Sequence, residues 1–252
     1  MNKVLQKLIP LSRKLADPAQ GLAIIGEGNT SAKIGDGTFW VKASGCQLSD
    51  IDESGFSRVD GKKILNVLDK KNLTDEDVAK HLKSALVDPA MRKPSVETFL
   101  HALCIFECQA NWVGHTHPIS VMSILCSKQG AKPFQSHIFP DEIVICGLHV
   151  AAIPYIDPGL MLANAVQDEL HRYLDDHGYP PKLILMGNHG MVALGKNPKD
   201  VLDISSMADK WAKTIIGTFT MGGPNYLTKE QADRIETRPD EDYRRKLITK
   251  KG

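Results

Sequence analysis

Residues Ala110-Asn111-Trp112-Val113-Gly114-His115-Thr116-His117-Pro118 decide how the rest of the chain is interpreted. An apolar run precedes the two histidines and Pro118 ends the pattern, so we predict a buried β-strand that closes at His115 and His117. Side chains two residues apart in a strand lie on one face. The sequence thus predicts two adjacent imidazoles at a strand end. They would supply two ligands of a metal site or, alternatively, be hydrogen-bonded core histidines.

The composition is that of one globular domain. The chain has 252 residues, 42% of them apolar, and a formal net charge of +1. This balance argues against nucleic acid or an anionic membrane as the main partner. No apolar tract is long enough to span a bilayer, and the N-terminus lacks the apolar core of a signal peptide, so we expect a cytoplasmic protein. The five cysteines contain no CxxC pair and are expected to be reduced. We expect the domain over residues 1–222 and a polar, partly disordered tail over 223–252.

Two glycine-containing turns lie close together near the N-terminus. The segment 26–31 follows an apolar run but lacks the third glycine and the helix of a dinucleotide-binding motif. Instead, Gly35-Asp36-Gly37 predicts a hairpin between strands at 31–34 and 38–42, and the second strand leads into Ala43-Ser44-Gly45. We predict that the two turns cradle an anion, with ordinary turn chemistry as the alternative. The residues that would line this cradle are Gly28, Asn29, Thr30, Ser31, Ser44 and Gly45.

A carboxylate is expected beside the same region. The segment 93–97 opens a helix, with Pro94 in the first turn and Ser95 placed to cap it, and the residues that follow are apolar on most sides. Glu97 would therefore lie at the mouth of a buried helix. Burial there would raise the carboxyl pKa, whereas a favourable interaction with the helix dipole is the alternative role.

The remaining pattern alternates helices and strands, which predicts an α/β fold. A strand at 182–186 ends in Gly187-Asn188-His189-Gly190 and returns as a hairpin strand at 191–195. His189 would be open to a ligand because glycines flank it at a strand end. Further helices are predicted at 2–16, 74–86, 118–126, 160–176 and 198–219, further strands at 143–146 and 149–153, a solvated connection at 49–61 and a loop at 133–140.

Three histidines from two strand ends, with a carboxylate at a helix start, match the ligand count of a catalytic zinc site: three protein ligands and one open position. Neutral imidazoles leave the metal most of its positive charge, so it can act as a Lewis acid. Together with an anion cradle, this set indicates metal-stabilised enolate formation on a phosphorylated hydroxyketone. The chain has no nucleophile elbow, no Walker loop and no candidate Schiff-base lysine.

In these motifs the sequence resembles the class II aldolase/adducin superfamily, which includes fuculose-phosphate aldolase, rhamnulose-phosphate aldolase and ribulose-phosphate 4-epimerase. The segments GEGNTSAK, WVKASG and KPSVETFLHA are most similar to the aldolase domain that is fused to a short-chain dehydrogenase in rhamnose pathways. The resemblance covers residues 5 to 220 and is carried, in the family's order, by Gly28–Ser31, Ala43–Gly45, Pro94–Glu97, His115–His117 and His189–Gly190.

The resemblance implies a three-layer α/β/α sandwich around a largely antiparallel central sheet, in a homotetramer with sites between subunits. It implies that His115, His117 and His189 bind Zn²⁺ or another divalent transition metal, and that Glu97 is the acid/base. The implied reaction cleaves L-rhamnulose 1-phosphate or L-fuculose 1-phosphate to dihydroxyacetone phosphate and lactaldehyde. The substrate phosphate would be held by Gly28, Asn29, Ser44, Gly45 and Ser95.

Two positions depart from the family pattern. Val96 replaces a second serine that often precedes the glutamate, which removes a phosphate donor. The loop after the paired histidines contains His137 and no tyrosine, so His137 is the candidate proton donor. Epimerase, decarboxylase or dehydratase activity on a sugar phosphate or sugar acid stays open, as does a non-catalytic, adducin-like binding module.

Overall fold

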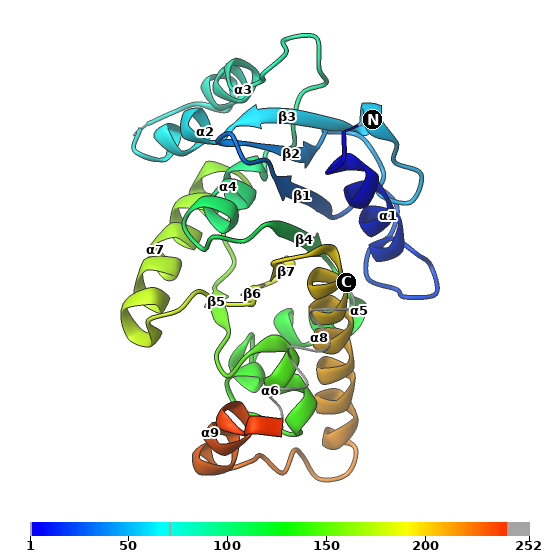
Figure 1. Ribbon diagram of the computed structural model, residues 1–252. Helices are drawn as coiled ribbons and strands as arrows, with labels where there is room; N and C mark the ends of the chain where they lie inside the picture. The colour runs from blue at the N-terminus through cyan, green and yellow to red at the C-terminus, as the bar shows by residue number, and fades with distance from the viewer. Residues whose placement is uncertain (1, 71, 241–252) are drawn as a thin grey trace.

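The computed structural model describes residues 2–70 and 72–240 and contains a seven-stranded sheet (Figure 1). The strand order is β3-β2-β1-β4-β7-β6-β5, and every neighbouring pair is antiparallel except β5 and β6. The prediction of an α/β fold with a largely antiparallel sheet is therefore confirmed. The strands are β1 (Asn29–Lys33), β2 (Thr38–Lys42), β3 (Phe56–Asp60), β4 (Trp112–Thr116), β5 (Ala151–Ile153), β6 (Leu183–Met186) and β7 (Gly190–Gly195).

Helices pack against both faces of the sheet and form two buried apolar clusters. Successive strand residues point to opposite faces, so Val192 of β7 joins the cluster with α2, α3, α4 and α7, whereas Met191 joins the cluster with α1, α5, α6 and α8. Figure 1 shows α2, α4 and α7 to the left of the sheet, α3 above it, and α1 and α8 to its right. The helices are α1 (Leu5–Leu15), α2 (Gly61–Leu68), α3 (Asp75–Ser84), α4 (Thr98–Phe106), α5 (Ile119–Leu125), α6 (Pro140–Cys146), α7 (Leu160–His177), α8 (Pro198–Phe219) and α9 (Lys229–Thr237).

Local capping explains why several helices begin where the sequence predicts. Thr74 and Asn197 each form a capping box with an aspartate three residues later, at the starts of α3 and α8. The predicted β1–β2 hairpin is also present. Two secondary-structure predictions are wrong. Residues 143–146 lie in α6, because Pro140 at the first helical turn and two acidic residues after it start a helix. Residues 49–61 contain the edge strand β3, which was predicted as a solvated connection.

The segment 223–252, predicted as a polar tail, contains a packed helix. Thr228 caps α9, and Ala232 and Ile235 are buried against Ile143 and Val144 of α6. Residues 241–252 lie outside the described part of the chain. Across residues 2–70 and 72–240, no helix combines the length and the apolar character that a membrane crossing requires.

Candidate active site

The three predicted histidines meet at one end of the sheet. His115 lies near the end of β4, His117 follows that strand, and His189 lies in the turn between β6 and β7. One nitrogen from each ring lies within 4.8 Å of the other two, and His115 is completely buried. The antiparallel pairing of β4 with β7 brings these two chain segments together, with His115 opposite Val192.

Gly190 makes this close packing of rings possible. A Cβ atom at this position would lie 2.6 Å from Cδ2 of His117 and 3.2 Å from Cε1 of His115. Both distances are too short for a methyl group beside an imidazole in its present place. The glycine after His189 is therefore part of the architecture that holds the paired histidines.

The hydrogen bonds of the paired rings indicate what lies between them. Nδ1 of His115 donates to the Met191 carbonyl oxygen at 2.9 Å, and Nδ1 of His117 lies 3.3 Å from Oε2 of Glu27. Each ring therefore directs the lone pair of Nε2 inward, and the two Nε2 atoms are 2.9 Å apart. Two lone pairs at this distance require a positive charge between them, either a proton or a metal ion. The residues present thus fit a metal ion.

Glu97 completes the group from the start of α4. Its Oε1 lies 3.0 Å from Nε2 of His189 and 3.4 Å from Nε2 of His115. Burial raises the pKa of Glu97, but the neighbouring His115 and His189 outweigh burial and hold it well below its usual range. Glu97 also raises the pKa of His115 against the opposite effect of burial. The expectation of a raised Glu97 pKa is therefore wrong, because the effect of the two histidines exceeds that of burial.

His117 differs from His115 in its proton affinity. Burial, followed by the charges of His115 and His189, lowers the pKa of His117 to about 3. His117 is thus a neutral ring at neutral pH, as metal ligation requires. Nδ1 of His189 is buried and lacks a hydrogen-bond partner within the described part of the chain.

The predicted anion cradle adjoins this group. The turn after β2 lies against the segment before α4, because Ser44 N donates to the Lys93 carbonyl at 2.9 Å and Ser95 N donates to the Lys42 carbonyl at 3.3 Å. Gly28 has a positive φ of 72°, and a Cβ there would lie 2.7 Å from the His115 carbonyl oxygen. Only glycine fits this close approach. Asn29 pairs with His115 across β1 and β4, and its amide donates to Glu97.

Lys42 is a site residue that the sequence did not reveal. The residue is only 4% exposed, and among residues 2–70 and 72–240 its ammonium group has no hydrogen-bond or ion-pair partner. Burial lowers the pKa of Lys42, whereas its electrostatic neighbours Cys46 and Glu97 raise it by less. A buried lysine without a partner, beside Ser44 and Gly45, is suited to binding an anionic group of a ligand.

Two further residues were missed, and their signals in the sequence were weak. The sequence places Glu27 in a glycine-containing turn, yet its carboxylate accepts a hydrogen bond from His117. His101 was treated as part of an apolar helix, yet it is completely buried and bonds Ser31 and Asn29. The spacing of four residues between Glu97 and His101, one helical turn, is the one feature that could have singled out His101.

His137, the candidate proton donor, has a different environment. Its Nδ1 bonds the buried Glu142 at 3.0 Å, its Nε2 bonds the Leu148 carbonyl at 2.9 Å, and its ring stacks on Trp211. Both ring nitrogens are therefore occupied by structural contacts. Within the described ranges, no contact joins His137 to the three histidines of the same chain, and its role as a proton donor stays a prediction.

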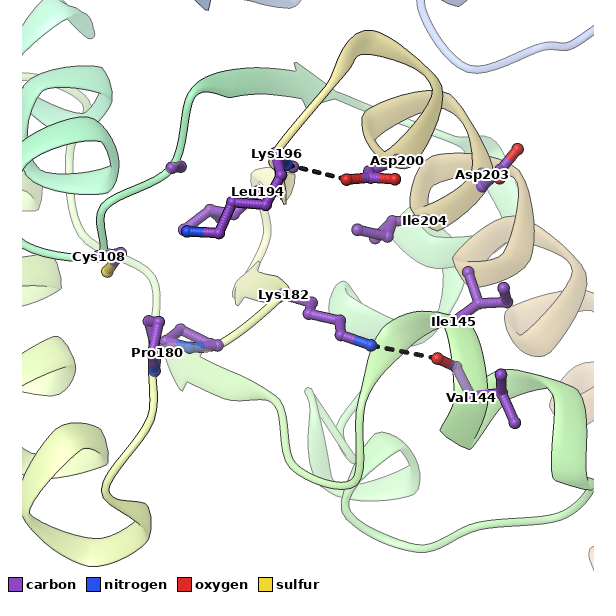
Figure 2. Close-up of a pocket in the computed structure, with 13 residues that line it drawn as sticks. Cys108, Val144, Ile145, Pro180, Lys182, Leu194, Lys196, Asp200, Asp203 and Ile204 are labelled. Atoms are coloured by element: carbon purple, nitrogen blue, oxygen red, sulfur yellow. Dashed lines mark hydrogen bonds between the residues drawn. The ribbon is translucent and has the colours of Figure 1, made fainter. Parts of the chain in front are cut away.

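A separate pocket of about 330 Å³ lies at the opposite end of the β6–β7 hairpin (Figure 2). Lys182 and Lys196 line it next to the outer ends of these strands, ~17 Å of strand length from the histidines. The Lys182 ammonium donates to the Val144 carbonyl, and the Lys196 backbone donates to Asp200. No predicted site residue lines this pocket.

Comparisons with known proteins agree with this fold. The family model described as Class II Aldolase and Adducin N-terminal domain matches residues 6–216. The N-terminal class II aldolase domain of a conserved protein from Thermoplasma acidophilum is 26% identical, with a TM-score of 0.69 over 86% of this chain and 95% of that chain. An L-fuculose 1-phosphate aldolase has the same fold, with a TM-score of 0.67 and 18% identity over 97% of this chain and 98% of that one.

A putative aldolase/epimerase/decarboxylase from Klebsiella pneumoniae, YgbL, has a TM-score of 0.66 and 20% identity over 90% of this chain and 95% of that chain. The uncharacterized oxidoreductase YuxG of Bacillus subtilis is 29% identical over 179 residues, which is 68% of this chain and 24% of that protein. This chain therefore spans about a quarter of that curated relative. Because the family model covers most of the sequence and includes every residue of the histidine group, the chain belongs to the class II aldolase and adducin family.

Proposed function

We propose that this protein is a metal-dependent lyase that cleaves a ketose or deoxyketose 1-phosphate, such as L-rhamnulose 1-phosphate or L-fuculose 1-phosphate. The products would be dihydroxyacetone phosphate and an aldehyde, lactaldehyde for these two substrates. The observation that carries the proposal is one group of contacts: three imidazole nitrogens beside a carboxylate, next to a cradle that contains a buried lysine. Family membership supports the same chemistry.

His115, His117 and His189 would hold Zn²⁺ or another divalent transition metal. When bound, this ion supplies Lewis-acid stabilisation of negative charge on the substrate oxygens. Glu27 and the Met191 carbonyl fix the tautomers of His117 and His115, so both rings are ready to ligate.

Glu97 would carry the proton in the chemical step. In the cleavage direction, the C4 hydroxyl loses its proton as the C3–C4 bond breaks, which releases the aldehyde. The electron pair of that bond stays on the three-carbon phosphate half, and C3 must then gain a proton. The Glu97 carboxylate would take up the C4 hydroxyl proton and then return it to C3, because its Oε1 faces the histidine group at 3.0 Å from His189.

The substrate phosphate would bind in the cradle formed by Gly28, Asn29, Ser44, Gly45 and Ser95. Lys42 adds the cation that these neutral donors lack, and it offsets the loss of a hydroxyl donor at Val96. A Lys42→Met variant should therefore raise KM for a sugar phosphate with little change in kcat.

A second candidate is a lyase or decarboxylase that acts on a sugar acid. The observation that favours it is the same cradle, since one lysine with neutral hydroxyl and amide donors also suits a carboxylate. YgbL, described as a putative aldolase/epimerase/decarboxylase, has the same fold. An epimerase or dehydratase of this fold belongs to the same group of alternatives.

We also propose an oligomer, with the tetramer as the expected form, and a functional domain over residues 1–222. Large apolar side chains are exposed close in sequence to the site residues. Ile25 lies two residues before Glu27, and Ile119 two residues after His117. Such exposed apolar groups are typical of subunit contacts around a site. Tyr155 and Met161 are further exposed side chains of this kind.

Product analysis tests the proposed function. The purified protein would be incubated with L-rhamnulose 1-phosphate, L-fuculose 1-phosphate, L-ribulose 5-phosphate and a set of sugar acids, and products would be identified by mass spectrometry. Release of dihydroxyacetone phosphate with an aldehyde would support the lyase. Epimerisation without a three-carbon product, or carbon dioxide release from an acid, would replace it with the second group of activities.

A further inference from the structure

His101 is a buried histidine that neither the metal group nor the anion cradle requires. It lies in α4, one turn after Glu97, and none of its side chain is exposed. Its Nδ1 is 2.7 Å from Oγ of Ser31, and its Nε2 bonds Oδ1 of Asn29. The ring thus spans two residues of β1 that point to the same face of the sheet.

A chain of hydrogen bonds continues from His101 to the histidine group. Nδ2 of Asn29 donates to Oε2 of Glu97, while Oε1 of Glu97 faces His189 at 3.0 Å. The two carboxylate oxygens of Glu97 therefore have separate partners. One is held by Asn29, and the other is directed into the group.

The direction of every hydrogen bond in this chain follows from the placement of the Asn29 amide, whose Nδ2 faces Glu97. An amide nitrogen donates and an amide oxygen accepts, so Asn29 presents its NH₂ group to Glu97 and its carbonyl oxygen to His101. Nε2 of His101 must then carry a proton and donate it. Burial keeps the ring neutral, and it has no carboxylate partner among residues 2–70 and 72–240, so Nδ1 must accept from the Ser31 hydroxyl.

We propose that His101 is a positioning residue, which with Ser31 holds the Asn29 amide in the one orientation that donates to Glu97. Without this donor, the Asn29 amide is free to rotate by half a turn and to place its oxygen against the carboxylate. Glu97 would then lose its fixed orientation toward the histidine group. The second N–H of Asn29 stays available for a ligand in the cradle, so His101 also orients that donor.

The tautomer of His101 tests the proposal without any assay of activity. In ¹⁵N-histidine-labelled protein, the His101 signal would be assigned by its absence in His101→Gln. We expect a proton on Nε2 and none on Nδ1. A ring protonated on Nδ1 would overturn the proposal, because Asn29 would then have to turn its carbonyl oxygen toward Glu97.

Two near-matched variants separate positioning from packing. The amide nitrogen of Gln can reach the place of Nε2 and donate to Asn29, whereas the shorter Asn reaches only the place of Nδ1 near Ser31. This part of the test rests on the proposed function, since it needs a turned-over substrate. We expect His101→Gln to keep kcat within about threefold, and His101→Asn and His101→Leu to lower kcat by about 10- to 100-fold at unchanged metal content.

His171→Leu provides the control, because His171 is an exposed helical histidine paired with Glu107 and lies outside the site. Equal losses of kcat in the Gln and Asn variants would indicate a packing role and overturn the proposal. If no sugar phosphate or sugar acid is turned over by the wild type, the proposed function fails. The tautomer measurement still decides the role of His101 in that case.

Discussion

Substitution of Gly190 by Ala tests the architecture of the histidine group with one methyl group. The added Cβ would lie 2.6 Å from Cδ2 of His117 and 2.8 Å from the Thr116 carbonyl oxygen. Gly190 does not have a positive φ, so alanine meets no backbone strain and the effect comes from the contacts alone. Overpacking of this kind costs about 1–3 kcal/mol when the surroundings must shift.

The His117 ring lies outside the strand and should give way first. A displaced ring loses its alignment with His115 and His189, and we expect the affinity for Zn²⁺ to fall at least about tenfold, which corresponds to about 1.4 kcal/mol. The assay is a competition titration of metal-free protein against a chromophoric chelator, together with thermal unfolding. Gly217→Ala is the control, since no atom lies within 4 Å of its added Cβ. Wild-type affinity in the Gly190→Ala variant would refute the role assigned to this glycine.

Three further predictions concern residues around the group. Glu27→Gln keeps the shape of the side chain but weakens the acceptor for Nδ1 of His117, so metal affinity should fall about 10- to 100-fold in the same titration. An unchanged affinity would show that Glu27 does not support metal binding. Burial lowers the pKa of His101 from its ordinary 6.5 to about 3, so between these values the unfolded chain binds a proton that the folded protein does not, and stability falls as the pH falls. At pH 5 this lowers the free energy of unfolding by about 2 kcal/mol relative to pH 7. Urea unfolding at the two pH values should show that this loss is smaller by that amount in His101→Gln than in wild type. Equal losses in the two proteins would contradict the low pKa of His101. His137→Phe leaves Glu142 buried without its histidine partner, so the free energy of unfolding should fall by about 3 kcal/mol. Turnover should stay unchanged. A large loss of kcat at normal metal content would indicate that His137 acts in the reaction.

Much of the site could be predicted because its residues stand at ends of regular elements. The apolar run before His115 predicts a strand, the glycines around His189 predict a turn, and both predictions place a ring where strands end. Sequence order alone does not tell which strands pair. The adjacency of β4 and β7, which joins His115 to the His189 turn, comes from the tertiary fold.

The missed parts depend on tertiary contacts that leave no periodic signal. Residues 143–146 are four apolar residues, a run too short to distinguish a strand from a turn of buried helix. Lys42 looks like an ordinary polar residue at the end of a strand, and only the fold shows that it is buried. The low pKa of Glu97 likewise arises from His115 and His189, which lie 18 and 92 residues away in the chain.

A divalent metal ion held by His115, His117 and His189 should be required for the proposed lyase activity. The most direct measurement is the metal content per chain, combined with dihydroxyacetone phosphate release before chelation, after chelation and after Zn²⁺ is restored, for wild type and His117→Ala. We predict one metal ion per wild-type chain, loss of release on chelation with recovery on Zn²⁺ addition, and neither tight metal binding nor release in the variant. Folded wild-type protein that takes up no metal, or release that persists in metal-free protein, would contradict the account.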